Sequence, residues 1–150
     1  MKKFKFSLEK VLEIKEIEEK VIQKNLYLVQ NQIYETEESI KKLTENISIE
    51  REKVFQMSRA TASSSEIMLH TKYIDGLQIN LESLTQVLVQ LREKESLIKA
   101  QLLEKTKEKK ALDRLKEIKF EEYQKQYKKE QQLFIDDISI QNHRFKTGNF

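Results

Sequence analysis

The sequence contains no cysteine, no proline and no tryptophan, and its 150 residues include only two glycines. Without cysteine the chain can form neither a disulfide framework nor a thiolate metal site, which fits a reducing compartment. With no proline and so little glycine, it lacks the turn signals that separate the strands of a β-sheet. These absences argue against a disulfide-rich domain and against any fold built on strands.

Long apolar runs are also missing. No stretch approaches the roughly 18 apolar residues of a transmembrane helix, and the N-terminal residues lack the apolar core of a signal peptide. The net charge of +3 is the small difference between 28 basic and 25 acidic residues, so it gives little indication of an anionic partner. We therefore expect a soluble, intracellular protein.

The side chains needed for catalysis are equally sparse. The only histidines are His70 and His143, and no glycine-rich loop is present that could bind a phosphate. Carboxylates are abundant, but paired catalytic acids need a pocket that shifts their pKa values. We therefore expect no enzyme activity, no cofactor and no metal site. Tyr123 and Tyr127 lie among the lysines of residues 105–129, which could suggest a nucleic-acid site. Seven acidic residues at positions 104–130 favour a solvated helix face instead.

What the sequence does contain is charge, at 35% of residues, and a regular spacing of apolar side chains. In each half of the chain the apolar residues recur in alternating steps of four and three, which is a heptad pattern. Nine of the eleven positions in each half are apolar. The first half contributes Ile22, Leu26, Val29, Ile33, Thr36, Ile40, Leu43, Ile47, Glu50, Val54 and Met57. The second half contributes Ile67, His70, Ile74, Leu77, Leu81, Leu84, Leu88, Leu91, Glu95, Ile98 and Leu102.

A serine-rich stretch at residues 58–66 separates the two halves, and Ser63 and Glu66 have the spacing of a helix-capping box. Folding the chain back at residue 62 sets the two apolar stripes against each other, with Ile33 opposite Leu91. The sequence thus predicts an all-α fold, a long antiparallel two-helix coiled-coil hairpin. We expect one domain over residues 1–150, with a first arm at 3–57, a turn at 58–65, a second arm at 66–138 and a frayed tail at 139–150. A monomer is expected, although a parallel dimer also satisfies the heptads.

We call the contact between the two heptad stripes the seam. The N-terminal residues carry more apolar side chains than this seam can bury. On a helical wheel Leu8, Val11, Leu12 and Ile22 gather on one side, and the opposite side collects Ile14, Ile17 and Val21. The second arm also outruns the first, so that Phe4 would lie beside Phe120 and the residues from 121 onward would have no partner. We therefore expect an external partner to bind at this end of the hairpin.

The opening motif Phe4-x-Phe6-x-Leu8-x-x-Val11-Leu12, followed by Glu-Ile-Glu-Glu at residues 16–19, resembles the N-terminus of the flagellar export protein FliJ family. Residues 110–132 are similar in character to the C-terminal arm of that family, and the resemblance covers nearly the whole chain. It implies a coiled coil similar to the central stalk, or gamma subunit, of rotary ATPases. It also implies a non-enzymatic component of the flagellar type III protein export apparatus.

The resemblance implies specific partners. The terminal end would insert into the hexameric export ATPase (FliI) and promote assembly of its ring, and the stalk would contact the export gate protein FlhA and escort export chaperones. The protein would lie in the cytoplasm, held at the inner membrane through these partners, with no nucleic-acid partner. The candidate ring-contact residues, including the stripe that the seam leaves unused, are Phe4, Phe6, Leu8, Val11, Leu12, Ile14, Ile17 and Val21. The candidate gate-contact residues are Tyr73 and Leu77.

Other functions remain open at the level of sequence. One is the equivalent stalk of a non-flagellar type III secretion system. Others are a generic structural coiled coil, or a protein that binds nucleic acid or a membrane surface through its basic, tyrosine-bearing C-terminal segment.

Overall fold

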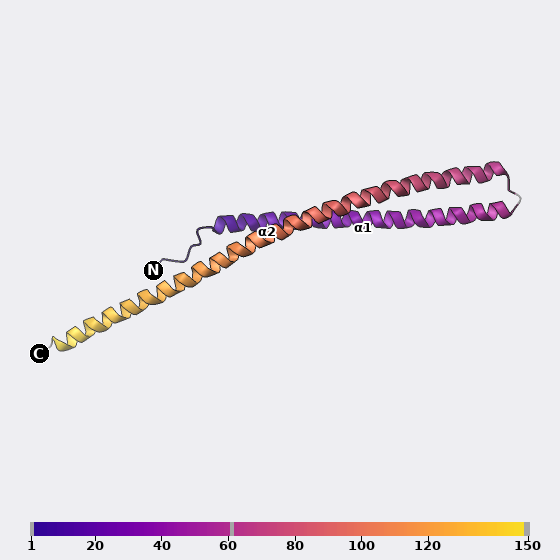
Figure 1. The fold of residues 1–150 in the computed structure, drawn as a ribbon. Helices are drawn as coiled ribbons and strands as arrows, with labels where there is room; N and C mark the ends of the chain where they lie inside the picture. Colours follow the sequence, from indigo (N-terminus) through magenta and orange to yellow (C-terminus); the bar gives the residue numbers. More distant parts are fainter. Residues whose placement is uncertain (1, 61, 149–150) are drawn as a thin grey trace. The chain divides into compact units, whose positions relative to one another are not determined.

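A computed structural model describes residues 2–60 and 62–148. It contains two helices, α1 (Glu9–Arg59) and α2 (Ser64–Thr147), joined by a short turn (Figure 1). No strand occurs within these described ranges. The two helices pack against each other as an all-α helical hairpin, which confirms the predicted fold class.

The chain divides into two compact units. The turn unit comprises Lys20–Leu103, and the terminal unit comprises Met1–Glu19 together with Glu104–Phe150. The sequence predicted one domain over residues 1–150. The division falls where the apolar stripe of α2 gives way to lysines at positions 105 and 109, which pair with Glu18 and Glu19 of α1.

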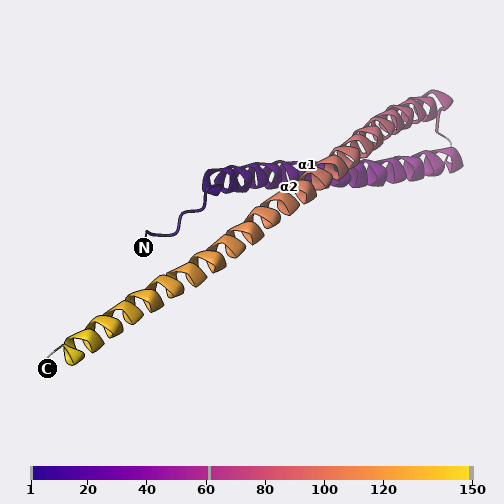
Figure 2. The same ribbon diagram turned by 60° about the vertical axis from the view of Figure 1, so that its left-hand side comes forward.

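The turn unit is held by the predicted seam. Every position of both heptad stripes is buried or half-buried, including Val29, Ile33 and Ile98 at the centre of the core. The partly buried residues packed against this centre are Ile22, Leu26, Leu88 and Leu91. Figures 1 and 2 both show α1 and α2 side by side on either side of the turn. This arrangement is the antiparallel pairing that the sequence predicts.

The serine-rich stretch ends one helix and begins the next. The Ser58 hydroxyl donates to the Phe55 carbonyl at 2.7 Å, and the chain leaves α1 after Arg59. At the start of α2, the Glu66 N–H donates to the Ser63 hydroxyl at 3.3 Å, which is half of a capping box. The helices thus take in residues 58–59 and 64–65, which the sequence assigned to the turn, and position 61 lies outside the described residues.

Both ends of the chain differ from the predicted arms. The first arm was expected from residue 3, but α1 begins at Glu9 and residues 2–6 precede it without helical structure. The tail was expected to fray from residue 139, but α2 continues to Thr147. No glycine or proline interrupts residues 139–147, and Arg144 and Lys146 complement the helix dipole in the last turn. Positions 149–150 of the predicted tail lie outside the described residues.

Truncation of the seam should destabilise the hairpin. Ile33 is 9% exposed against Ile98 and Val29, so Ile33→Ala should lower the free energy of unfolding by about 2 kcal/mol or more. The neighbouring Tyr34 is 64% exposed, and Tyr34→Ala should change it by no more than about 0.5 kcal/mol. Denaturant unfolding followed by circular dichroism measures both values. Equal effects of the two substitutions would contradict the seam.

Candidate partner-binding site

The terminal unit begins with an N-terminal segment that packs on α2 through aromatic side chains. The Phe4 ring meets Phe120 edge-on, with ring centroids 5.2 Å apart and planes at 66°. It also contacts Tyr123, at 5.5 Å between centroids. Edge-to-face ring pairs of this kind are favourable beyond the area they bury. The structure thus places Phe4 beside Phe120, as folding the chain back at residue 62 predicts.

A hydrogen bond fixes the same segment to α2. The Tyr123 hydroxyl donates to the Lys2 carbonyl at 2.9 Å, and the Tyr123 ring stacks on Tyr127 at 6.3 Å. From the sequence these tyrosines were expected to belong to a solvated helix face, and the contact of Tyr123 with the N-terminal segment was not predicted. The available signal was the spacing of the aromatic side chains, since positions 120, 123 and 127 follow one another in steps of three and four on one face of α2.

The entry into α1 is buried. The Glu9 N–H donates to the Phe6 carbonyl at 3.1 Å, and the Phe6 side chain is only 8% exposed. Leu12, one turn into the helix, is 3% exposed. The Glu9 carboxylate, in the first turn of α1, also pairs with the Lys116 ammonium at 2.8 Å. This hydrogen bond raises the pKa of Lys116 above its usual value.

An ionic cluster joins the two helices in the terminal unit. Lys15 pairs with Glu108 at 2.8 Å, and Lys105 pairs with Glu18 at 2.9 Å. Weaker contacts close the cluster, from Lys15 to Glu18 at 3.7 Å and from Lys105 to Glu108 at 3.6 Å. The hydrogen bond from Lys105 lowers the pKa of Glu18, and the one from Lys15 lowers the pKa of Glu108. These pairs of opposite charges favour one alignment of the two helices along their length.

The candidate ring-contact residues fall into three groups by exposure. Phe6 and Leu12 are buried, so they shape the terminal unit from within and are not available at its surface. Phe4 and Leu8 are half-buried. The exposed members are Val11 at 40%, Ile14 at 53% and Ile17 at 61%, together with Val21 of the turn unit at 53%. The stripe of Ile14 and Ile17 is therefore outside the seam, as the helical wheel predicts.

The two candidate gate-contact residues also differ in their exposure to solvent. Tyr73 is 55% exposed on α2, whereas Leu77 is half-buried in the seam. Tyr73 borders a groove that is also lined by Glu50, Leu69, His70 and Lys72. The exposed tyrosine is therefore the member of this pair that a partner can reach directly.

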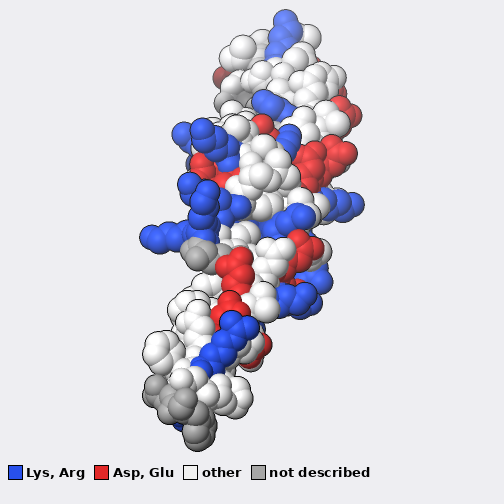
Figure 3. All heavy atoms as spheres, turned by 90° about the vertical axis from the view of Figure 1, so that its left-hand side faces the viewer, with Lys and Arg blue, Asp and Glu red and all other residues white. Residues whose placement is uncertain are grey.

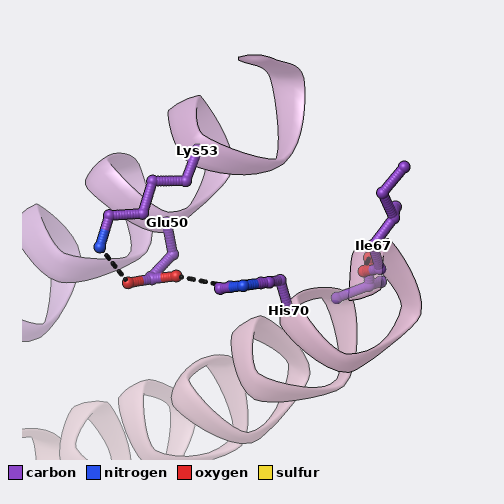
Figure 4. Close-up of polar contacts among 5 residues, drawn as sticks. Glu50, Lys53, Ile67 and His70 are labelled. Atoms are coloured by element: carbon purple, nitrogen blue, oxygen red, sulfur yellow. Dashed lines mark hydrogen bonds and ion pairs between the residues drawn. The ribbon is translucent and has the colours of Figure 1, made fainter. Parts of the chain in front are cut away.

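Two of the residues that line this groove, Glu50 and His70, form a polar layer of the seam. Figure 4 shows their contact. The Glu50 carboxylate on α1 contacts Nδ1 of His70 on α2 at 3.3 Å and accepts from the Lys53 ammonium at 3.2 Å. The hydrogen bond from Lys53, supported by that with His70, lowers the pKa of Glu50. Glu50 and His70, one polar position from each stripe, thus contact each other across the helices.

Charges of both signs are interspersed over the face seen in Figure 3, without an extended field of one sign. In residues 2–60 and 62–148, no group of three or more histidine or acidic side chains is placed to hold a metal ion. Among the same described residues, no helix is both long enough and apolar enough to cross a bilayer.

A comparison with protein families finds a match over most of the chain. A sequence model of a protein family, described as flagellar FliJ protein, matches residues 4–148. No curated protein and no solved structure matches the chain. The matched range spans both units and includes every candidate contact residue.

Loss of the aromatic contact should release the N-terminal segment. Phe4→Ala removes both ring contacts that hold residues 2–6 on α2, so trypsin should cleave after Lys5 about tenfold faster than in the unaltered chain. The matched control is Phe145→Ala, because Phe145 is 79% exposed at the far end of α2. Cleavage at the same rate in both variants would show that Phe4 does not anchor the segment.

Proposed function

The chain belongs to the FliJ family, and from this premise we propose that it is a stalk of the flagellar type III export apparatus. The family is a non-catalytic, coiled-coil component related to flagellar export. We propose more specifically that the terminal unit inserts into the hexameric export ATPase (FliI) and promotes assembly of its ring. The hairpin would also link the ring to the export gate FlhA and escort export chaperones.

The observation that supports ring binding is the two-sided N-terminal part of α1. Its inner face packs on α2 through Leu12 and is fixed by the ionic cluster of Lys15 and Glu18. Its outer face keeps Ile14 and Ile17 more than half exposed. Exposed isoleucines on a helix already committed to one partner favour a second apolar contact. A ring lumen lined with apolar side chains is a partner of that kind.

The remaining candidate residues take graded parts in this proposal. Val11 contributes to the contact at the edge of the exposed surface, and Val21 adds a separate apolar side chain in the turn unit. Phe4 and Leu8 hold the N-terminal segment in place. Because both are half-buried, only part of each side chain can contact a partner. Phe6 and Leu12 act indirectly, because they support the surface from the interior.

For the export gate, Tyr73 is the proposed contact. Tyrosine is enriched where interfaces concentrate their binding energy, because its ring buries a large area and its hydroxyl finds a polar partner. Leu77 lies in the seam one turn further along α2, so its proposed part is to fix the position of Tyr73. Through ring and gate together, the protein would be held at the cytoplasmic face of the inner membrane.

The ring contact is tested by ATP hydrolysis and ring assembly of the export ATPase. The unaltered chain should stimulate both, and Ile14→Asp/Ile17→Asp should remove most of the stimulation, by about tenfold or more, because two apolar contacts become charged. The matched control is Ile79→Asp/Leu97→Asp, since these residues of the turn unit are 65% and 67% exposed. No stimulation by the unaltered chain, or full stimulation by the first double variant, would overturn the proposal.

The gate contact is tested by calorimetry with the cytoplasmic domain of the gate protein. Tyr73→Ala should weaken binding by about tenfold, as expected for an aromatic side chain at the centre of an interface. Tyr34→Ala serves as the control, because Tyr34 is similarly exposed, at 64%, on α1 of the same unit. Equal affinity of the two variants would place the gate contact elsewhere.

A further inference from the structure

The C-terminal overhang of α2, residues 124–147, is exposed along its whole length. Its side chains nevertheless keep the spacing of the seam, with steps of four and three through Tyr127, Gln131, Phe134, Ile138, Gln141 and Phe145. The four apolar members are 41%, 66%, 42% and 79% exposed in that order. In Figure 2 this stretch, orange to yellow, has no other described segment of the terminal unit beside it. The overhang thus presents a heptad stripe that no other described segment of the terminal unit covers.

The order of residues in this stripe is symmetric about position 136. If the stripe is reversed about that position, Tyr127 falls opposite Phe145, Gln131 opposite Gln141, and Phe134 opposite Ile138. Every apolar residue then meets an apolar residue, and the two glutamines meet each other. We propose that the overhang binds the overhang of a second copy of this chain in an antiparallel coiled coil centred on residue 136.

The register of this pairing is specific. A shift by one heptad sets Gln131 against Phe134 and reduces the number of apolar layers. In the symmetric register the two glutamine amides can donate to and accept from each other, so that no buried amide is left unsatisfied. A polar layer of this kind fixes the alignment of a coiled coil at some cost in stability.

The flanking residues support the antiparallel orientation. Positions that flank the stripe on one side place Glu130 beside Arg144 of the second copy, and the twofold symmetry repeats this ion pair. On the other side Ile135, which is 54% exposed, meets its own counterpart. A parallel pairing would instead direct Glu130 toward Ile135 and gain no ion pair. The pairing has one unfavourable contact, because Asp137 meets Asp137 of the second copy near the centre.

The proposed contact does not compete with the N-terminal segment. In the symmetric register, a second α2 that ends at Thr147 reaches only as far as residue 125 of the first chain. It therefore stops before Tyr123, where Lys2 and Phe4 are bound. The paired stretch from Tyr127 to Phe145 is about 28 Å long at 1.5 Å per residue, which is short for a coiled coil. The association should accordingly be reversible and depend on concentration.

Sedimentation equilibrium of the full chain tests the proposal. The unaltered chain should show a monomer–dimer equilibrium, and Phe134→Glu should weaken it about a hundredfold or more, since each dimer loses two buried rings. The matched control is Leu133→Glu, because Leu133 is 64% exposed on another face of the same helical turn and should leave the equilibrium unchanged. Circular dichroism verifies that both variants remain helical. A chain that stays monomeric at every concentration, or equal weakening by both variants, would overturn the proposal.

Two further variants test the orientation and the symmetric centre. The chain has no cysteine, so tagged Gln131→Cys mixed with untagged Gln141→Cys should form the mixed disulfide in preference to either self-linked product. Self-linked products alone would indicate a parallel dimer and contradict the proposed register. Asp137→Asn should strengthen the dimer by about fivefold, because it removes the repulsion between like charges. An unchanged or weaker dimer in this variant would contradict a centre at residue 136.

Discussion

The structure depends on one constraint, namely that each long helix carries a narrow apolar stripe that it cannot bury by itself. Both stripes follow alternating steps of four and three, so a second helix running back along the first covers them in register. In the turn unit this cover is complete, and no predicted seam position is left exposed. Two packed helices bury only one face of each, so the other faces remain available to partners. Function in such a protein rests on surface contacts between chains.

The helix α2 is covered differently along its length. In the turn unit it packs on α1 through branched aliphatic side chains. In the terminal unit the ionic cluster of Lys15, Glu18, Lys105 and Glu108 joins the helices. Further along α2, a short non-helical segment packs on it through Phe4 in place of α1. Beyond Tyr123 the stripe is exposed. The surfaces proposed for partners lie outside the seam or where its cover ends.

Much of this arrangement could be predicted from the sequence, because heptad spacing and a single serine-rich turn leave few ways to pair the stripes. The pairing of Phe4 with Phe120 follows from the same count of residues. Spacing alone could not show that α1 begins only at Glu9 or that Phe6 is buried, because periodicity does not report how a chain enters a helix. It also could not reveal the hydrogen bond from Tyr123 to the Lys2 carbonyl, which depends on a non-helical backbone.

The tail shows a second limit of sequence reasoning. A polar C-terminal stretch was expected to fray, yet α2 continues to Thr147, since no residue in it breaks a helix. A polar composition indicates that a segment is exposed to solvent. It does not indicate whether that segment is helical. The apolar side chains from Tyr127 to Phe145 share one face only if the segment is helical, so the stripe is recognised only once the helix is known.

The most direct test of the antiparallel seam is a distance between spin labels at Lys42 and Glu82, exposed positions equally far along the chain from residue 62. Two adjacent helices with side chains are each about 10–12 Å across, so a folded-back chain predicts one narrow distance distribution at about 20–30 Å. Because the pair is intramolecular, the signal should persist when labelled chain is diluted with unlabelled chain. A distance near 60 Å, expected for about 40 intervening residues in one continuous helix, would contradict the hairpin. A short distance that disappears on dilution would contradict it equally, because the contact would then lie between two chains.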